Sequence, residues 1–170
     1  ANCACVMGNL GLKVASLSVA GTDHYGEKII NDFKRFNVNT DFIDIVPGVE
    51  ANMAVILLDE SAEKSLIYVP GEEPPVSKTR YKEVISLCKA VYTMPGNVDE
   101  FEKFASVARE CEAQVAIDIE PHIADTPEKL SRILKLADIV FFNLDGFVTC
   151  VGEQPDKASL TALCQRYQLD

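Results

Sequence analysis

Polar residues follow apolar runs at four places in this sequence, where their side chains could together bind a small polar ligand. The four segments are Ala20-Gly21-Thr22-Asp23, Met94-Pro95-Gly96-Asn97, Asp118-Ile119-Glu120 and Asn143-Leu144-Asp145. Turns and helix caps use the same residue types, so each segment alone has an equally good structural explanation. In an open parallel α/β sheet, however, ligands bind outside the carboxyl ends of the strands. Four polar strand ends in one chain therefore favour a ligand-binding crevice.

The first of these segments belongs to a stretch in which an apolar run passes directly into a helical pattern. Gly21 and Gly26 permit a tight turn and a close approach of the backbone, and Asp23 is suited to cap the helix predicted over 25–36. The fingerprint G-x-G-x-x-G does not occur, so a dinucleotide-binding loop of that type is not indicated.

Apolar periodicity predicts an α/β chain with one interruption. We expect helices over 2–10, 25–36, 78–87, 98–111, 127–136 and 155–167, and strands over 13–19, 41–46, 51–58, 65–69, 90–93, 114–119 and 138–142. Gly11 is expected to end the first helix. The strands 51–58 and 65–69 are predicted to form a hairpin. The regular alternation of helix and strand elsewhere predicts a Rossmann-like parallel sheet flanked by helices, with the hairpin as a small lid.

Charge and cysteine usage restrict the kinds of partner. The net charge of −10 disfavours nucleic-acid binding, because nothing would neutralise the phosphate backbone. It leaves open a small anionic ligand, which backbone N–H groups can bind. No apolar run is long enough to span a membrane. The six cysteines contain no C-x-x-C pair, so no zinc site is indicated and a reducing cytoplasm is expected. His24 and His122 are interpreted as surface residues rather than as bases.

Several of these segments together resemble the ribokinase-like (PfkB) family of sugar and nucleoside kinases. The resemblance begins with Asn2-Cys3-Ala4 and continues through Gly11 to Gly21, Asp23 and Gly26. Residues 36–40 are similar to a further conserved segment of that family. The hairpin falls where the family has its β lid, and 138–152 falls where it has an Asn-x-x-Glu segment.

The resemblance implies a kinase that uses ATP and Mg²⁺ to phosphorylate a hydroxyl of a sugar. A nucleoside kinase and a degenerate, non-catalytic metabolite-binding member remain alternatives. The implied substrate-binding residues are Asn2, Gly96 and Asn97, and the implied phosphate and metal region comprises Asp118, Glu120, Asn143 and Asp145. Gly21, Asp23 and Gly26 would shape the signature loop. Asn2 could instead be a simple helix N-cap. No residue is expected to bind metal directly, and Gly146 stands where the family has its glutamate.

The resemblance also implies that catalytic parts lie outside these 170 residues. Relatives place a substrate-binding Asp before the position of Asn2, and place the general base and anion hole in a later Gly-Ala-Gly-Asp segment. We therefore expect no catalytic residue in this chain and no activity from it alone. The expected division is an α/β core of 1–48 and 71–170 with a lid of 49–70.

The lid is also expected to join two copies of the protein. Residues 53–58 are apolar without alternation, so both faces of that strand require cover. A homodimer in which two lids clasp each other would provide it. Packing of both faces within one chain is the alternative.

Overall fold

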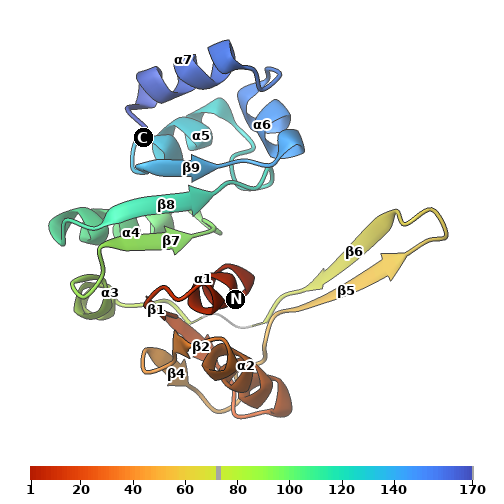
Figure 1. Cartoon of the computed structure of the whole chain (residues 1–170), viewed down its shortest axis with the longest axis vertical. Coiled ribbons are helices and arrows are strands. Elements are labelled where there is room, and N and C mark those ends of the chain that lie inside the picture. The colour runs from red at the N-terminus through yellow and green to blue at the C-terminus, as the bar shows by residue number, and fades with distance from the viewer. Residues whose placement is uncertain (72–73, 170) are drawn as a thin grey trace. The chain divides into compact units, whose positions relative to one another are not determined.

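The computed structural model describes residues 1–71 and 74–169, which form two compact units, Ala1–Pro75 and Val76–Asp170 (Figure 1). The predicted end of the lid near residue 71 adjoins residues 72 and 73, which lie outside the described residues, as does Asp170. The lid and core boundaries therefore stay a prediction. Both units are α/β with parallel strand pairs, as the periodicity indicates, and the first unit also carries an antiparallel hairpin.

The first unit places two helices beside two short parallel strand pairs. Its elements are α1 (Asn2–Asn9), β1 (Val14–Ala15), β2 (Ser18–Ala20), α2 (His24–Arg35), β3 (Val38–Asn39), β4 (Ile43–Ile45), β5 (Met53–Leu58) and β6 (Lys64–Val69). Strand β1 pairs with β3, and β2 pairs with β4. A small core of Ala20, Phe33, Val38 and Ile43 joins β2, α2, β3 and β4, and residues of α1 and β1 pack against it.

Three details of this unit correct the sequence-based interpretation. The strand expected over 13–19 is two strands, β1 and β2, because each half pairs with a different partner. Strand β3 was not predicted, since two residues are too short to show a period. The first helix does end before Gly11, which has a φ of +87°. Asn2 is not a helix N-cap, because Ala1 holds that position and no side chain caps α1.

The predicted hairpin is confirmed. Strands β5 and β6 pair antiparallel from Met53 opposite Val69 to Leu58 opposite Lys64. Asp59 fixes the turn between them, as its Oδ1 accepts from the backbone N–H groups of Ser61 at 2.8 Å and Glu63 at 2.9 Å. Every residue of both strands is exposed, and Figure 1 shows the hairpin extending away from the helices of its own unit.

The second unit is a three-stranded parallel sheet with five helices. Its elements are α3 (Lys78–Ile85), β7 (Ala90–Thr93), α4 (Val98–Glu110), β8 (Gln114–Asp118), α5 (Pro127–Leu134), β9 (Ile139–Phe141), α6 (Leu144–Val151) and α7 (Lys157–Tyr167). The strand order is β7-β8-β9, and all three arrows point the same way in Figure 1. The prediction did not include α6.

The core of this unit lies on one face of the sheet. Val115, Ile117 and Ile119 alternate toward it, and they meet apolar residues of α4 and α5 such as Phe101 and Leu134. Because side chains of β8 alternate between the two faces of the sheet, Asp118 lies on the face opposite this core. None of the described helices combines the length and the apolar character needed to cross a bilayer.

Candidate functional site

The carboxyl ends of β7, β8 and β9 lie along one edge of the second unit's sheet. Because the three strands are parallel neighbours, the segments that follow them emerge at the same edge. This edge gathers six of the predicted site residues: Gly96, Asn97, Asp118, Glu120, Asn143 and Asp145. The expectation that distant strand ends meet at one place is thus confirmed for this unit, while their part in ligand binding stays a prediction.

Asp118 is the best-positioned carboxylate of this edge. It ends β8 opposite Phe141 of β9, and its Oδ2 accepts a hydrogen bond from the Tyr92 hydroxyl of β7 at 3.4 Å. The rings of Tyr92 and Phe141 flank it in an edge-on arrangement, with centroids 6.5 Å apart. Tyr92 of β7 and Phe141 of β9 therefore lie on either side of the half-buried Asp118 of β8. The sequence contains no signal for Tyr92, because only the strand register brings it opposite β8.

Glu120 lies two residues further on and shares its surroundings with a thiol. Its backbone carbonyl accepts from the N–H of Ile123 at 3.0 Å, which tightens the loop before α5. Burial raises the pKa of the Cys150 thiol of α6, and the negative charge of Glu120 raises that pKa further. Cys150 therefore stays a neutral thiol beside the carboxylate at neutral pH.

Asn97 and Asn143 both cap helices with their side-chain oxygens. Asn97 Oδ1 accepts from the N–H groups of Asp99 at 2.9 Å and Glu100 at 3.1 Å, at the start of α4. Asn143 Oδ1 accepts from the N–H of Gly146 at 2.6 Å, at the start of α6. The ordinary capping explanation therefore holds for both oxygens, and only the amide NH₂ groups remain to serve a ligand.

Neighbouring atoms leave little room for a side chain at Gly146. A Cβ added there would lie 2.8 Å from Asn143 Oδ1 and 3.3 Å from the carbonyl oxygen of Ile119. A glutamate at this position would thus displace the cap of α6. Asp145, one residue earlier, is exposed in the first turn of the same helix.

The signature loop of the first unit is built by backbone contact. Asp23 Oδ1 accepts from the N–H of Gly26 at 2.8 Å and caps α2. A Cβ at Gly26 would overlap the carbonyl oxygen of Gly21, and one at Gly21 would overlap that of Val49. The two glycines therefore let α2 begin directly against the strand-to-helix turn, while the Asp23 side chain accepts from the N–H of Gly26 in the first turn.

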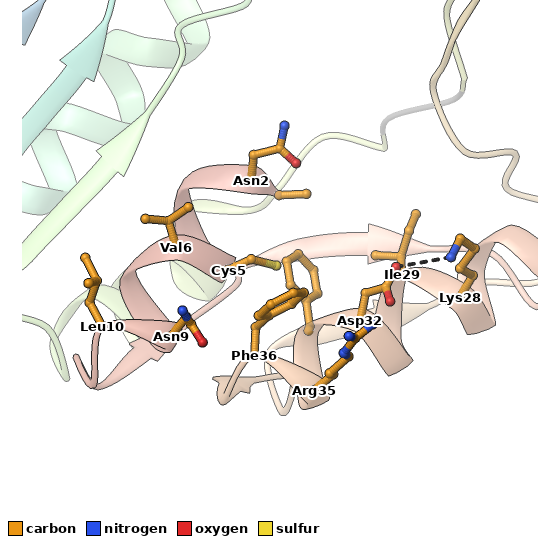
Figure 2. A pocket seen from close by; sticks show the side chains of 12 residues that line it. Asn2, Cys5, Val6, Asn9, Leu10, Lys28, Ile29, Asp32, Arg35 and Phe36 are labelled. Carbon is orange, nitrogen blue, oxygen red and sulfur yellow. Dashed lines mark ion pairs between the residues drawn. The ribbon is translucent and has the colours of Figure 1, made fainter.

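Asn2 lies at a groove of about 610 Å³ between α1 and α2 in the same unit. The groove is largely apolar, with Val6 on α1, Leu10 directly after α1 and Phe36 directly after α2. In Figure 2, Asn2 lies at the end of α1 with its amide directed away from the α2 side chains. The only ion pair drawn there is Lys28 with Asp32, at 3.4 Å.

No set of three or more His, Cys, Asp or Glu side chains gathers into a metal site among the described residues. Mg²⁺ often uses only one or two carboxylates together with water and phosphate, and the Asp118–Glu120 edge suits that mode. Both histidines are exposed.

Comparison with known families agrees with this architecture. The model of the pfkB family carbohydrate kinases matches residues 1–168. The chain belongs to the PfkB family of carbohydrate kinases. The match covers both units and all ten predicted site residues.

Individual PfkB relatives align with parts of the chain. A ribokinase of Bacillus subtilis is 34% identical over 77 residues, which is 45% of this chain and 26% of that protein. An uncharacterized sugar kinase of Archaeoglobus fulgidus is 31% identical over 65 residues, or 38% of this chain and 26% of that protein. These alignments thus span about a quarter of the curated relatives.

Solved structures of the same fold cover nearly the whole chain. The 2-dehydro-3-deoxygluconokinase of Thermotoga maritima has a TM-score of 0.82 at 12% identity, covering 99% of this chain and 59% of its own. A fructokinase of Xylella fastidiosa has a TM-score of 0.77 at 19% identity, covering 99% and 58%. An E. coli protein described as ribokinase II, in complex with ATP and Mg²⁺, has a TM-score of 0.77 at 16% identity, covering 95% and 56%.

Proposed function

We propose that the protein uses ATP to phosphorylate a hydroxyl group of a sugar. The observation that carries this proposal is the match of the carbohydrate-kinase family model to residues 1–168. The B. subtilis ribokinase and the X. fastidiosa fructokinase support a sugar as the acceptor. The E. coli structure with ATP and Mg²⁺ supports the donor and the ion.

The charges of the strand edge agree with a requirement for Mg²⁺. Asp118 ends β8, Glu120 follows two residues later, and the first turns of α4 and α6 add Asp99, Glu100 and Asp145. These carboxylates would repel the phosphates of ATP and offset the positive helix N-termini that could otherwise bind anions. A bound Mg²⁺ would neutralise phosphate charge. Asp118 and Glu120 would hold its water ligands, with the Tyr92 hydroxyl orienting Asp118.

Two amides are proposed to orient the substrate. Asn97 and Asn143 use their oxygens as caps, so their NH₂ groups are held in place and can donate to hydroxyl or phosphate oxygens. Asn2 is proposed as a substrate contact because it matches the family pattern, and Gly96 because it follows the end of β7 beside Asn97. Phosphoryl transfer depends on such positioning and on charge stabilisation.

Gly146 supports a second candidate function, a non-catalytic metabolite-binding protein. The position of the family's glutamate carries no side chain here, and the packing against Ile119 resists adding one. A nucleoside as the acceptor is a further alternative, since the apolar strands of the hairpin could meet a base as well as a sugar.

An assay of ADP release, over a panel of sugars and nucleosides with ATP and Mg²⁺, tests these alternatives on a longer protein in which this chain is extended to the full length of its relatives. Turnover with a sugar supports the proposed activity, and preference for a nucleoside would replace the acceptor. Calorimetric binding of a sugar without turnover would favour the non-catalytic protein. The 170 residues alone serve as the comparison and are expected to release no ADP.

We also propose that the hairpin of β5 and β6 joins two copies of the protein. Val55, Leu57 and Ile67 are about half exposed, so an apolar surface lacks cover in this chain. Both outer strand edges could pair with another hairpin. Light scattering of the longer protein should give a dimer, and Val55→Lys with Leu57→Lys should give a monomer. A wild-type monomer at micromolar concentration would rule out the clasp.

A cytoplasmic location is part of the proposal. The six described cysteines are all free thiols, as is usual in a reducing compartment. The acidic composition likewise supports a small-molecule partner rather than nucleic acid.

A further inference from the structure

Two cysteines lie together at the amino-terminal edge of the β7-β8-β9 sheet, at the opposite ends of the strands from the candidate site. Cys88 lies in the turn between α3 and β7, and Cys111 ends α4 just before β8. The strands they precede are neighbours, with Ala90 opposite Gln114. The N–H of Gln114 also donates to the carbonyl of Lys89 at 3.0 Å. The two turns therefore run side by side into adjacent strands.

Contacts between α3 and α4 fix the two turns relative to each other. Tyr81 packs its ring edge-on against Phe104, with centroids 5.4 Å apart. Glu110, the neighbour of Cys111, pairs with Lys78 at 2.7 Å and with Lys82 at 3.5 Å. These contacts join the last turn of α4 to the helix that leads into Cys88.

Hydrogen bonds hold the backbone of each cysteine. The N–H of Cys88 donates to the Ile85 carbonyl at 2.9 Å, and its thiol donates to the Val84 carbonyl at 3.4 Å. The N–H of Cys111 donates to the carbonyls of Val107 and Ala108, both at 3.1 Å. Both side chains are partly exposed, so a small oxidant can reach them.

The two sulfur groups also affect each other electrically. Burial raises the pKa of the Cys88 thiol, and the nearby Cys111 raises that pKa further because two thiolates repel. The influence of Cys111 on the pKa of Cys88 agrees with the adjacent placement of the two turns.

We propose that Cys88 and Cys111 form a reversible disulfide when the protein meets a peroxide. One thiolate attacks a peroxide oxygen, so that an S–O bond forms, the O–O bond breaks and hydroxide leaves. The second thiolate then attacks the sulfenic sulfur, forms the S–S bond and expels hydroxide. Each sulfur loses one electron to the peroxide, and the two protons lost by the thiols combine with the two hydroxides to give two waters. A dithiol reductant reverses the reaction. The bond would join the α3–β7 turn to the α4–β8 turn.

Tryptic mapping after oxidation tests this directly, because cleavage separates the two cysteines. Cys88 falls in the peptide 83–89 and Cys111 in the peptide 110–129, and neither contains another cysteine. The chain is treated with hydrogen peroxide, remaining thiols are alkylated, and the digest is analysed without reductant. We expect these two peptides linked as the most abundant pair, about 2 Da below the sum of their masses. Reductant should separate them.

Matched controls distinguish a native pair from random oxidation. Oxidation in denaturing urea should reduce the 88–111 link to the level of other pairs. Cys150→Ser with Cys164→Ser should retain the link, whereas Cys88→Ser or Cys111→Ser should abolish it. Failure of the wild-type chain to give this link, or a more abundant link to any other cysteine, would overturn the proposal whether or not the variants fold.

Discussion

Asn97 is the residue at which capping and ligand binding can be separated by experiment. Its Oδ1 accepts two backbone N–H groups at the start of α4, from Asp99 and Glu100, while its NH₂ group is not part of the cap. Asn97→Ala removes both functions. Asn97→Asp keeps an oxygen for the cap and removes only the amide donor. We therefore expect Asn97→Ala to lower both stability and ligand binding, and Asn97→Asp to lower ligand binding alone.

The size of the effect follows from the cap. Loss of an asparagine N-cap costs about 1 kcal/mol, within a range of about 0.5–2 kcal/mol. With a urea m-value of about 2 kcal/mol per M, Asn97→Ala should lower the unfolding midpoint by about 0.5 M. For Asn97→Asp, the gain from a negative charge at a helix N-terminus is offset by repulsion from Asp99 and Glu100. Its midpoint should therefore stay within about 0.2 M of wild type.

Urea unfolding followed by circular dichroism measures the midpoint, and hydrogen exchange gives the local result. The amides of Asp99 and Glu100 should lose protection in Asn97→Ala and keep it in Asn97→Asp. Equal midpoints for wild type and Asn97→Ala would refute the capping argument. In the longer protein, Asn97→Asp should weaken sugar binding; unchanged affinity would remove Asn97 from the proposed substrate contacts.

Three further predictions concern the core, a helix cap and the proposed metal region. Leu134→Ala should lower the free energy of unfolding by about 2–5 kcal/mol, because the Leu134 side chain is fully buried. Leu87 is exposed, so Leu87→Ala should change the free energy of unfolding by less than about 0.5 kcal/mol. Urea titration of the two variants compares these effects. The N–H of Ser159 donates to the Asp156 carboxylate and holds its pKa below the ordinary value of 3.8. The stabilisation that this carboxylate gives to α7 is therefore fully present above pH 3.8. It is lost as the pH falls through the lowered pKa of Asp156 in the folded protein. Hydrogen exchange at the start of α7 should show this loss on acidification, and Asp156→Asn should remove the pH dependence. Gly146→Glu in the longer protein should lower the Mg²⁺ concentration for half-maximal rate or leave it unchanged. Gly146→Ala is the control for the displaced Asn143 cap. A higher Mg²⁺ requirement in Gly146→Glu but not in Gly146→Ala would contradict the Asn-x-x-Glu alignment.

Local patterns in the sequence are sufficient for most elements and for the gathering of polar strand ends at one edge of the second sheet. The strand 90–93 has the predicted bounds, and the helices of the second unit begin within a few residues of their predicted starts. The reason is physical: the helical and strand periods are set by neighbours along the chain. Alternation of helix and strand also implies parallel strands, so that Asp118 and Asn143 reach the same edge. Helix α6 was missed because Asn143 was assigned to a loop, although it also caps the next helix.

The use of each polar atom was decided only by the tertiary structure. The contact of Tyr92 with Asp118 depends on the register between β7 and β8, and the crowding at Gly146 depends on where α6 meets the end of β8. The same is true of Cys88 and Cys111, which are far apart in the sequence but precede adjacent strands. Such contacts join residues more than twenty positions apart. No local propensity encodes them, because they arise from the packing of the whole sheet and its helices.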